Sequence, residues 1–369
     1  MELGRELVRY MKLHKRLFGD YDGFLMARPN ARVRRAIRGT ISDFLRRNKM
    51  PLIETAVIYG LYTGGGYGQP HKVSSIYGLM WITPKVCRYL LDDTVPVFTF
   101  FDTGLISLFE TLIRRFAIDV KLNVDIRRIR RDDSKSFGNI QIEFSNRNNP
   151  MSTMVKEYDF LIISPAMRYL LDIIDVSPIE KKIFRRQLTD TFFMSTLVDS
   201  PFGVRSAYPF DVHRKRLIRY DFEPYVGIDV FSVSKNYSGE SYKLGLTPGG
   251  KDGRRIQSTV YYQVGRDDPR IQEVGRYAEE KLHKHLREKH RIPYSLIARF
   301  ITPYFTRFSV PDMDKGIIWD VFDLQGHRKT WYIGGSVTFD TAGAVIEYNE
   351  KILRNYRLPP KRFEFDYTL

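Results

Sequence analysis

Cysteine is nearly absent from this chain, whose 369 residues contain one, Cys87. A single thiol forms no internal disulfide and provides no set of four thiolates for a structural zinc ion or an iron–sulfur cluster. Cys87 lies in an apolar, helix-like context, which is typical of a small core residue. His283, His285 and His290 lie among basic side chains that oppose cation binding. We therefore expect no metal site, and the cysteine usage fits a reducing compartment.

Long apolar runs are missing as well. No window of the sequence approaches the roughly 20 apolar residues that cross a bilayer. The first 20 residues interleave acidic and basic side chains with apolar ones, unlike the uninterrupted apolar stretch of a secretory signal. The sequence predicts a soluble, intracellular protein without a membrane span, with the cytoplasm as the expected location.

Acidic residues are in deficit: 43 Asp and Glu face 59 Lys and Arg, for a net charge of +16. This excess favours an anionic partner, such as a nucleic acid. Basic runs occur at 127–131, 213–219 and 283–291, and each run by itself is typical of a solvated face. Nucleic-acid binding would require the runs to converge on one surface, and no recognisable nucleic-acid motif accompanies them. An anionic partner is therefore a secondary hypothesis.

Apolar and aromatic residues are plentiful, at 43% and 14% of the chain, which is enough for a sizeable core. The pattern along the chain predicts an α/β plus α+β fold. We expect four segments: a helical part at 1–95, an α/β part at 96–168, an α+β part at 169–325, and a last strand and helix with a tail at 326–369.

Hydrophobic periodicity and turn residues predict the individual elements. The expected helices cover 2–17, 32–47, 52–61, 73–82, 105–116, 178–188, 268–289 and 341–355. The expected strands cover 97–101, 120–127, 139–145, 158–164, 192–199, 225–232, 255–264 and 329–334. Turns are expected at 146–153 and, as a hairpin loop, at 247–253.

Three separated motifs occur in a fixed order: Asp102-Thr103-Gly104-Leu105 with the strand 120–129, the strand 158–165, and Trp331–Ser336 with the helix after Thr341. In this order they resemble the flavin-containing amine oxidases and their oxidocyclase and desaturase relatives. Singly, the second motif is typical of a buried parallel strand and the third of a tight turn. The resemblance implies FAD as cofactor, held by a partial FAD-binding Rossmann-like domain with an interleaved substrate domain of mixed sheet and helices.

The resemblance also implies cofactor-binding residues. The backbone of Ile126 would meet the adenine end of FAD. Gly334 and Gly335 would admit the flavin, and the helix start with Gly343 and Ala344 would face its pyrimidine edge, where helix N–H groups suit negative charge. The chain has Ser336 where many members of the family have Glu.

The helical start extends the resemblance to oxidocyclase-like relatives, through Gly64–Gly68 and the tyrosine segment at 76–77. We expect a small organic substrate that loses hydride from a C–N or C–C unit, chemistry that the flavin carries. Tyr67, Tyr304 and Phe305 are named as candidates to line its pocket, although aromatic core packing is the better explanation for each, since aromatics occur throughout the chain. No catalytic residue is assigned.

One expected motif is missing. In the family, the FAD diphosphate rests on an early G-x-G-x-x-G turn between a strand and a helix, and this sequence has no such unit. Gly64–Gly68 follows a helical stretch and lacks the preceding strand. Three explanations stay open: the sequence starts after that unit, a partner chain or homo-oligomer completes the sheet, or the protein is an inactive scaffold whose basic surface binds an anionic partner.

Overall fold

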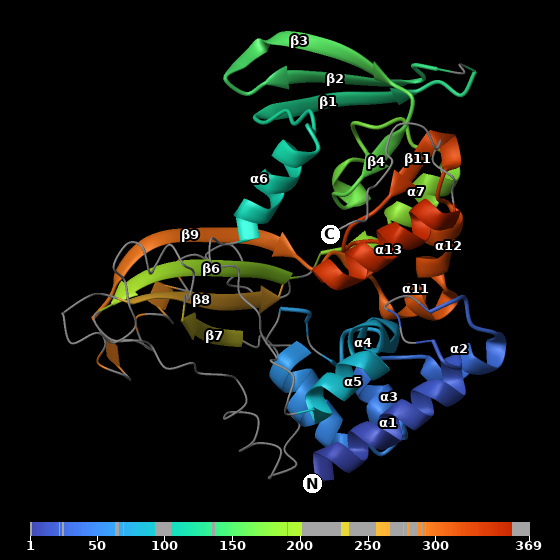
Figure 1. The fold of residues 1–369 in the computed structure, drawn as a ribbon, viewed down its shortest axis with the longest axis vertical. Helices are drawn as coiled ribbons and strands as arrows, with labels where there is room; N and C mark the ends of the chain where they lie inside the picture. The colour runs from blue at the N-terminus through green and yellow to red at the C-terminus, as the bar shows by residue number, and fades with distance from the viewer. Residues whose placement is uncertain are drawn as a thin grey trace.

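The computed structural model describes residues 2–92, 105–200, 230–235, 256–265 and 293–355, with isolated residues between 276 and 291 and short gaps at 22, 24–25, 63–65, 69, 135–136 and 190. Its described part combines helices with antiparallel and parallel strands (Figure 1). The predicted mixture of helix and sheet is therefore confirmed. None of the helices in these ranges is long and apolar enough to cross a membrane.

The N-terminal segment is a helical lobe at one end of the molecule (Figure 1). Its elements are α1 (Glu2–Phe18), α2 (Ala31–Ile37), α3 (Ile41–Arg47), the π-helix η1 (Ile53–Tyr62), α4 (Ser75–Trp81) and α5 (Pro84–Leu91). The lobe packs closely: a Cβ on Gly78 of α4 would lie 1.6 Å from Cδ1 of Ile41 on α3. Cys87 is fully buried, as expected of a core residue.

The predicted single helix over 32–47 is wrong, because the chain breaks between α2 and α3. Gly39 has a φ of +94°, which favours glycine, and Thr40 caps α3. The Thr40 hydroxyl accepts from the Asp43 N–H, and the Asp43 carboxylate accepts from the Thr40 N–H, forming a capping box. α5 was not predicted, although Thr83 and Pro84 carry its cap and first-turn signals.

An antiparallel meander follows the exposed helix α6 (Leu105–Arg115). Its strands are β1 (Val124–Arg131), β2 (Ile140–Asn146) and β3 (Asn149–Tyr158), in the order β1-β2-β3. The turn expected over 146–153 is wrong, since β3 already begins at Asn149. The strand expected at 97–101 lies outside the described residues.

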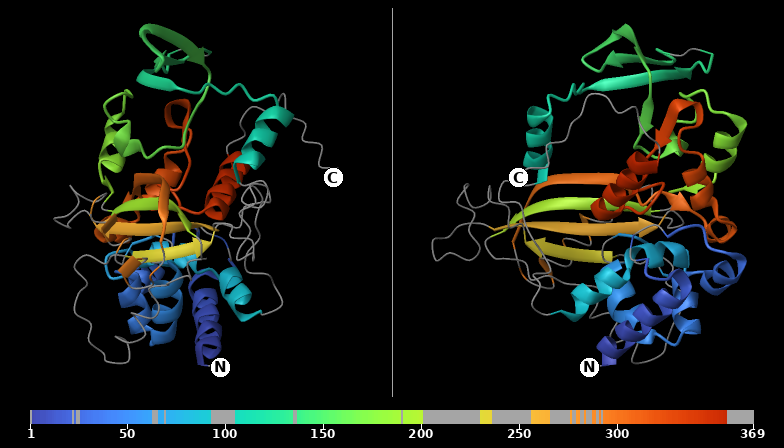
Figure 2. Two further views of the ribbon diagram at one scale, coloured as in Figure 1. Left: turned by 90° about the vertical axis from the view of Figure 1, so that its left-hand side faces the viewer. Right: turned by 45° about the vertical axis from the view of Figure 1, so that its right-hand side comes forward.

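Parallel pairing in the described segments consists of two short strands and one isolated bridge between Ile129 and Ile174. β4 (Leu161–Ile163) pairs with β11 (Thr330–Tyr332). The predicted strands at 158–164 and 329–334, which are far apart in sequence, therefore lie side by side. Around this pair lie α7 (Pro178–Phe184), α12 (Ile317–Asp323) and α13 (Ala342–Asn355) (Figures 1 and 2). Short elements connect them: η2 (Met167–Tyr169), β5 (Gln187–Leu188), β10 (Arg307–Phe308), α11 (Val310–Lys315) and η5 (His327–Lys329).

A second, four-stranded antiparallel sheet has the order β7-β8-β6-β9. It consists of β6 (Thr191–Ser200), β7 (Val230–Lys235), β8 (Ile256–Gly265) and β9 (Ser295–Tyr304), of which β9 was not predicted. The loop expected at 247–253 and most of the helix expected at 268–289 lie outside the described residues. One cluster of buried residues runs from Leu7 in α1 to Ile352 in α13, so the helical lobe and the β4–β11 region share a core.

Candidate active site

The carboxyl ends of β4 and β11 meet at a tight turn. The Ile333 N–H donates to the Ile163 carbonyl at 2.9 Å, and Gly334 follows with a φ of +87°. A Cβ on Gly334 would lie 2.6 Å from the Ser164 carbonyl oxygen, and one on Gly335 would lie 2.4 Å from Oδ1 of Asp340. Close contacts within the protein therefore require glycine at both positions, as expected of a tight turn. The turn lies outside the carboxyl ends of two parallel strands, where sheets of this kind bind ligands.

Two hydroxyl groups beyond this turn are buried without a hydrogen-bond partner. They belong to Ser336 and Thr338, whose residues are 9% and 0% exposed. The turn itself is held in place, because the Gln187 side-chain N–H donates to the Ser336 carbonyl at 3.2 Å. Buried hydroxyls are nearly always satisfied by protein, water or ligand. The two free hydroxyls fit a polar ligand group at this turn.

The helix α13 begins directly after the turn. The Thr341 hydroxyl accepts from the Ala344 N–H at 3.3 Å and so satisfies one first-turn donor. Ala344 is fully buried, whereas Gly343 is exposed. The helix start, with its positive dipole end, therefore lies beside the glycine turn. The structure brings together five of the six predicted cofactor residues: Gly334, Gly335, Ser336, Gly343 and Ala344.

Ile126, the sixth, lies apart on β1 of the meander. It pairs with Phe144 of β2, next to a register shift, and its side chain is 42% exposed. It belongs to a different sheet from the glycine turn. Its predicted contact with adenine stays a prediction.

The three predicted pocket residues come together. The ring centroid of Tyr67 lies 6.2 Å from that of Tyr304 and 5.6 Å from that of Phe305. Phe339, three residues after Ser336, joins them at 4.8 Å from Tyr67. Phe305 and Phe339 are buried, which agrees with core packing, whereas Tyr67 and Tyr304 are half-buried at the rim. We call these four residues the aromatic cluster.

Two further tyrosines, neither of which was predicted to line the pocket, pack against the aromatic cluster. Tyr62 of η1 lies 5.9 Å from Phe339, and Tyr77 of α4 lies 5.5 Å from Phe305, both centroid to centroid. Both are buried, and the Tyr62 hydroxyl has no hydrogen-bond partner. A neighbouring acid was also missed: Asp340 follows Phe339 in the loop before α13, and burial raises its pKa.

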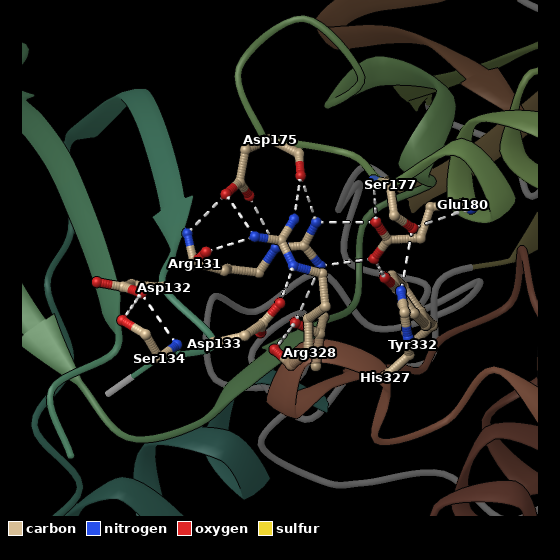
Figure 3. Close-up of polar contacts among 11 residues, drawn as sticks. Arg131, Asp132, Asp133, Ser134, Asp175, Ser177, Glu180, His327, Arg328 and Tyr332 are labelled. Carbon is tan, nitrogen blue, oxygen red and sulfur yellow. Dashed lines mark hydrogen bonds and ion pairs between the residues drawn. The ribbon is translucent and has the colours of Figure 1, made fainter. Parts of the chain in front are cut away.

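A buried ionic network holds the β4–β11 pair against the meander (Figure 3). The Arg131 guanidinium of β1 donates to both Glu180 carboxylate oxygens of α7, at 2.5 and 2.9 Å. Glu180 also accepts from the Tyr332 hydroxyl of β11 and from the Ser177 N–H. Burial opposes ionisation of Glu180, but the hydrogen bonds from Arg131, Tyr332 and Ser177 outweigh it and lower the pKa to about 2.

A polar depression of about 710 Å³ lies beside this network, between β1, β2 and the segment 172–175. Several of its charged groups are paired within the protein: Arg328 pairs with Asp133 at 2.9 Å and with Asp175 at 3.0 Å. Arg131, from the predicted basic run at 127–131, is wholly buried here. We regard this depression as structural. The run at 213–219 lies outside the described residues, so convergence of the basic runs stays a prediction.

No group of three or more His, Cys, Asp or Glu side chains in the described ranges could hold a metal ion. The sequence matches no protein-family profile and no curated protein.

Solved structures do resemble this fold. A fatty acid isomerase from P. acnes is similar over 96% of this chain and 75% of its own, with a TM-score of 0.68 and 18% identity. Putrescine oxidase with bound putrescine is similar over 96% and 76%, with a TM-score of 0.55 and 10% identity. A putative protoporphyrinogen oxidase from Exiguobacterium sp. 255-15 is similar over 86% and 67%, with a TM-score of 0.50 and 14% identity. The chain therefore has an amine-oxidase-type fold, as its motifs indicated.

Proposed function

We propose that this protein is an FAD-dependent oxidoreductase of the amine-oxidase type, which removes hydride from a C–N or C–C unit of a small organic substrate. One arrangement carries the proposal: a glycine turn, two unpartnered buried hydroxyls and an aromatic cluster meet at the carboxyl ends of β4 and β11. The fold shared with oxidases and an isomerase supports it.

The turn residues and the start of α13 would hold the flavin end of FAD. When bound, FAD supplies the acceptor for the hydride. The Ser336 and Thr338 hydroxyls would supply polar contacts, with Ser336 in place of the family's carboxylate. The positive end of the α13 dipole would favour negative charge on the flavin pyrimidine edge.

The aromatic cluster would form the substrate side of the site. Buried Phe305 and Phe339 make a rigid apolar floor, and half-buried Tyr67 and Tyr304 are the members a substrate would reach. Aromatic rings exclude water and orient a small substrate through their faces and edges.

The diphosphate of FAD needs residues that this chain lacks, so we infer that a further β-α-β unit completes the site. The surface supports this inference. Parallel sheets are normally covered on both faces, yet Ile162 of β4 is 52% exposed. The amphipathic helix α6 and the residue after it also expose apolar side chains: Ile106, Leu108, Phe109, Leu112, Ile113 and Phe116. The unit would come from the same polypeptide, a partner chain or a second copy.

A non-catalytic scaffold that binds an anionic partner is the second candidate, favoured by the net charge of +16. The absorbance spectrum of the protein purified from the cells that make it separates the two. Near-stoichiometric flavin bands support the oxidoreductase. A colourless protein that FAD does not reconstitute supports the scaffold.

A further inference from the structure

One acidic side chain stands beside the aromatic cluster. Asp340 follows Phe339 of the cluster and precedes Thr341, the cap of α13. Its carboxylate receives a hydrogen bond from the backbone N–H of Phe305, another cluster member. Gly335 leaves the space for it, since a Cβ there would lie 2.4 Å from Asp340 Oδ1. The fold thus places one carboxylate between the glycine turn and the aromatic cluster.

The two half-buried tyrosines of the cluster, Tyr67 and Tyr304, lie close enough to this carboxylate to respond to its charge. The hydroxyls of Tyr67 and Tyr304 share a hydrogen bond, and burial together with the nearby charge of Asp340 raises the pKa of both. A cation, Arg307, also lies beside the cluster: its guanidinium is 5.2 Å from the Phe305 ring centroid and donates to the Phe305 carbonyl. The charge of Arg307 acts on Tyr62 and Tyr77, beneath the cluster, and not on Asp340.

Asp340 differs in this respect from the structural carboxylate of the same region. Glu180 is buried with a guanidinium, a tyrosine hydroxyl and a backbone N–H around it, and it stays ionised. In the described part of the chain, burial raises the pKa of Asp340, the hydrogen bond from the Phe305 N–H opposes that shift, and no cation contributes. A desolvated and unpaired carboxylate costs stability, and such groups gather at sites of proton transfer.

We propose that Asp340 is the acid–base residue of this pocket, and that Tyr67 and Tyr304 connect it to solvent. The proposal rests on the proposed function. Oxidation of a C–N or C–C unit removes a hydride from one atom and a proton from its neighbour. Asp340 takes that proton: the N–H or C–H bond of the neighbouring atom breaks, an O–H bond forms at the carboxylate, and the electron pair enters the new double bond. FAD, when bound, would supply the acceptor for the hydride.

A carboxylate suits this role when its pKa moves toward the working pH, because it then accepts the proton more readily and still returns it to water. The hydrogen-bonded hydroxyls of Tyr67 and Tyr304 provide the return path at the half-buried rim. If Asp340 had a purely structural role, its removal would lower the free energy of unfolding, because removal of a paired buried carboxylate destabilises the fold.

The test is a carbon-13 NMR titration of aspartate carboxyls in the full chain, with Asp340→Asn used for assignment. Asp20, which is exposed and paired with Lys15, provides the control Asp20→Asn. We expect the pKa of Asp340 to lie above its ordinary value of 3.8, because burial raises it. A carboxyl that ionises at or below that value overturns the proposal.

Unfolding measurements in the same variants separate catalysis from structure. Because the folded pKa is raised, ionised Asp340 lowers stability as pH rises from 3.8 through the folded value. Asp340→Asn should lose this decline and match or exceed the wild type at pH 8. A variant less stable than wild type there assigns Asp340 a structural role and overturns the proposal. Neither measurement needs FAD. A protein that binds no flavin would therefore contradict the proposed function, whereas the titration and unfolding measurements on Asp340 would still give a result.

Discussion

The Arg131 guanidinium and the Glu180 carboxylate form a doubly hydrogen-bonded ion pair in which neither side chain is exposed. The pair joins β1 to α7, and through the Tyr332 hydroxyl it reaches β11, the strand that leads to the glycine turn. The geometry of the candidate site therefore depends on a charge pair about 50 residues apart in sequence, and loss of either partner would leave the other charge buried and unpaired.

Glu180→Ala leaves the Arg131 charge buried without its main partner. We expect it to lower the free energy of unfolding by about 3–5 kcal/mol, as measured by urea denaturation. Glu350→Ala is the matched control, because the Glu350–Arg354 pair is exposed and of the i,i+4 type. It should change stability by less than about 0.5 kcal/mol. Equal effects of the two variants would contradict a dominant role for the buried pair.

The same pair predicts acid sensitivity. The pKa of Glu180 is about 2 in the fold against an ordinary value of 4.5. The group therefore stabilises the fold above its unfolded pKa, and this contribution is lost as pH falls through the folded pKa, over about pH 5 to pH 2. Glu180→Gln should be less stable at neutral pH and show a shallower decline in that range. Parallel pH profiles for wild type and variant would refute this assignment.

Gly334→Ala tests the glycine turn. The substitution places a Cβ against the Ser164 carbonyl at a φ of +87°, so both strain and collision oppose it. Gly19→Ala is the control, since Gly19 has a φ of +69° and nothing near its missing Cβ. We expect the control to cost about 1 kcal/mol and Gly334→Ala to cost at least about 1 kcal/mol more in unfolding free energy. If both cost the same, the approach to Ser164 imposes no constraint.

Thr338→Val tests whether the unpartnered hydroxyls serve a ligand. The substitution keeps the volume and removes a buried hydroxyl that the protein does not satisfy. The flavin-free protein should become as stable or more stable, while FAD binding weakens about fivefold or more, as measured by quenching of flavin fluorescence. Thr111→Val, on exposed α6, should leave the FAD affinity unchanged. Unaltered affinity in Thr338→Val would mean that this hydroxyl does not contact the cofactor.

Local patterns predicted much of this fold because they act within one element. The amphipathic stretch of α1, the alternation in β2 and the helix α13 after the glycine pair are visible in the sequence. The break between α2 and α3 had a local signal in Gly39 and the Thr40–Asp43 capping box, but the apolar periodicity across it favoured one helix.

Such local patterns do not reveal contacts between residues that are far apart in the sequence. β9 is stabilised by pairing with β6, about 100 residues earlier, and not by its own alternation. The aromatic cluster was found in part, since Tyr67, Tyr304 and Phe305 were named, but Phe339 and Asp340 gain their roles only from their approach to those residues. The Arg131–Glu180 pair was missed for the same reason, because a basic run by itself is typical of a solvated face.

The most direct test of the central claim is the visible spectrum of the protein isolated from the cells that make it, with every polypeptide that accompanies it. Flavin absorbance near 450 nm, at a ratio of about one FAD per chain and reduced in Thr338→Val but not in Thr111→Val, is the predicted result. A colourless preparation that stays without flavin after incubation with FAD would contradict it.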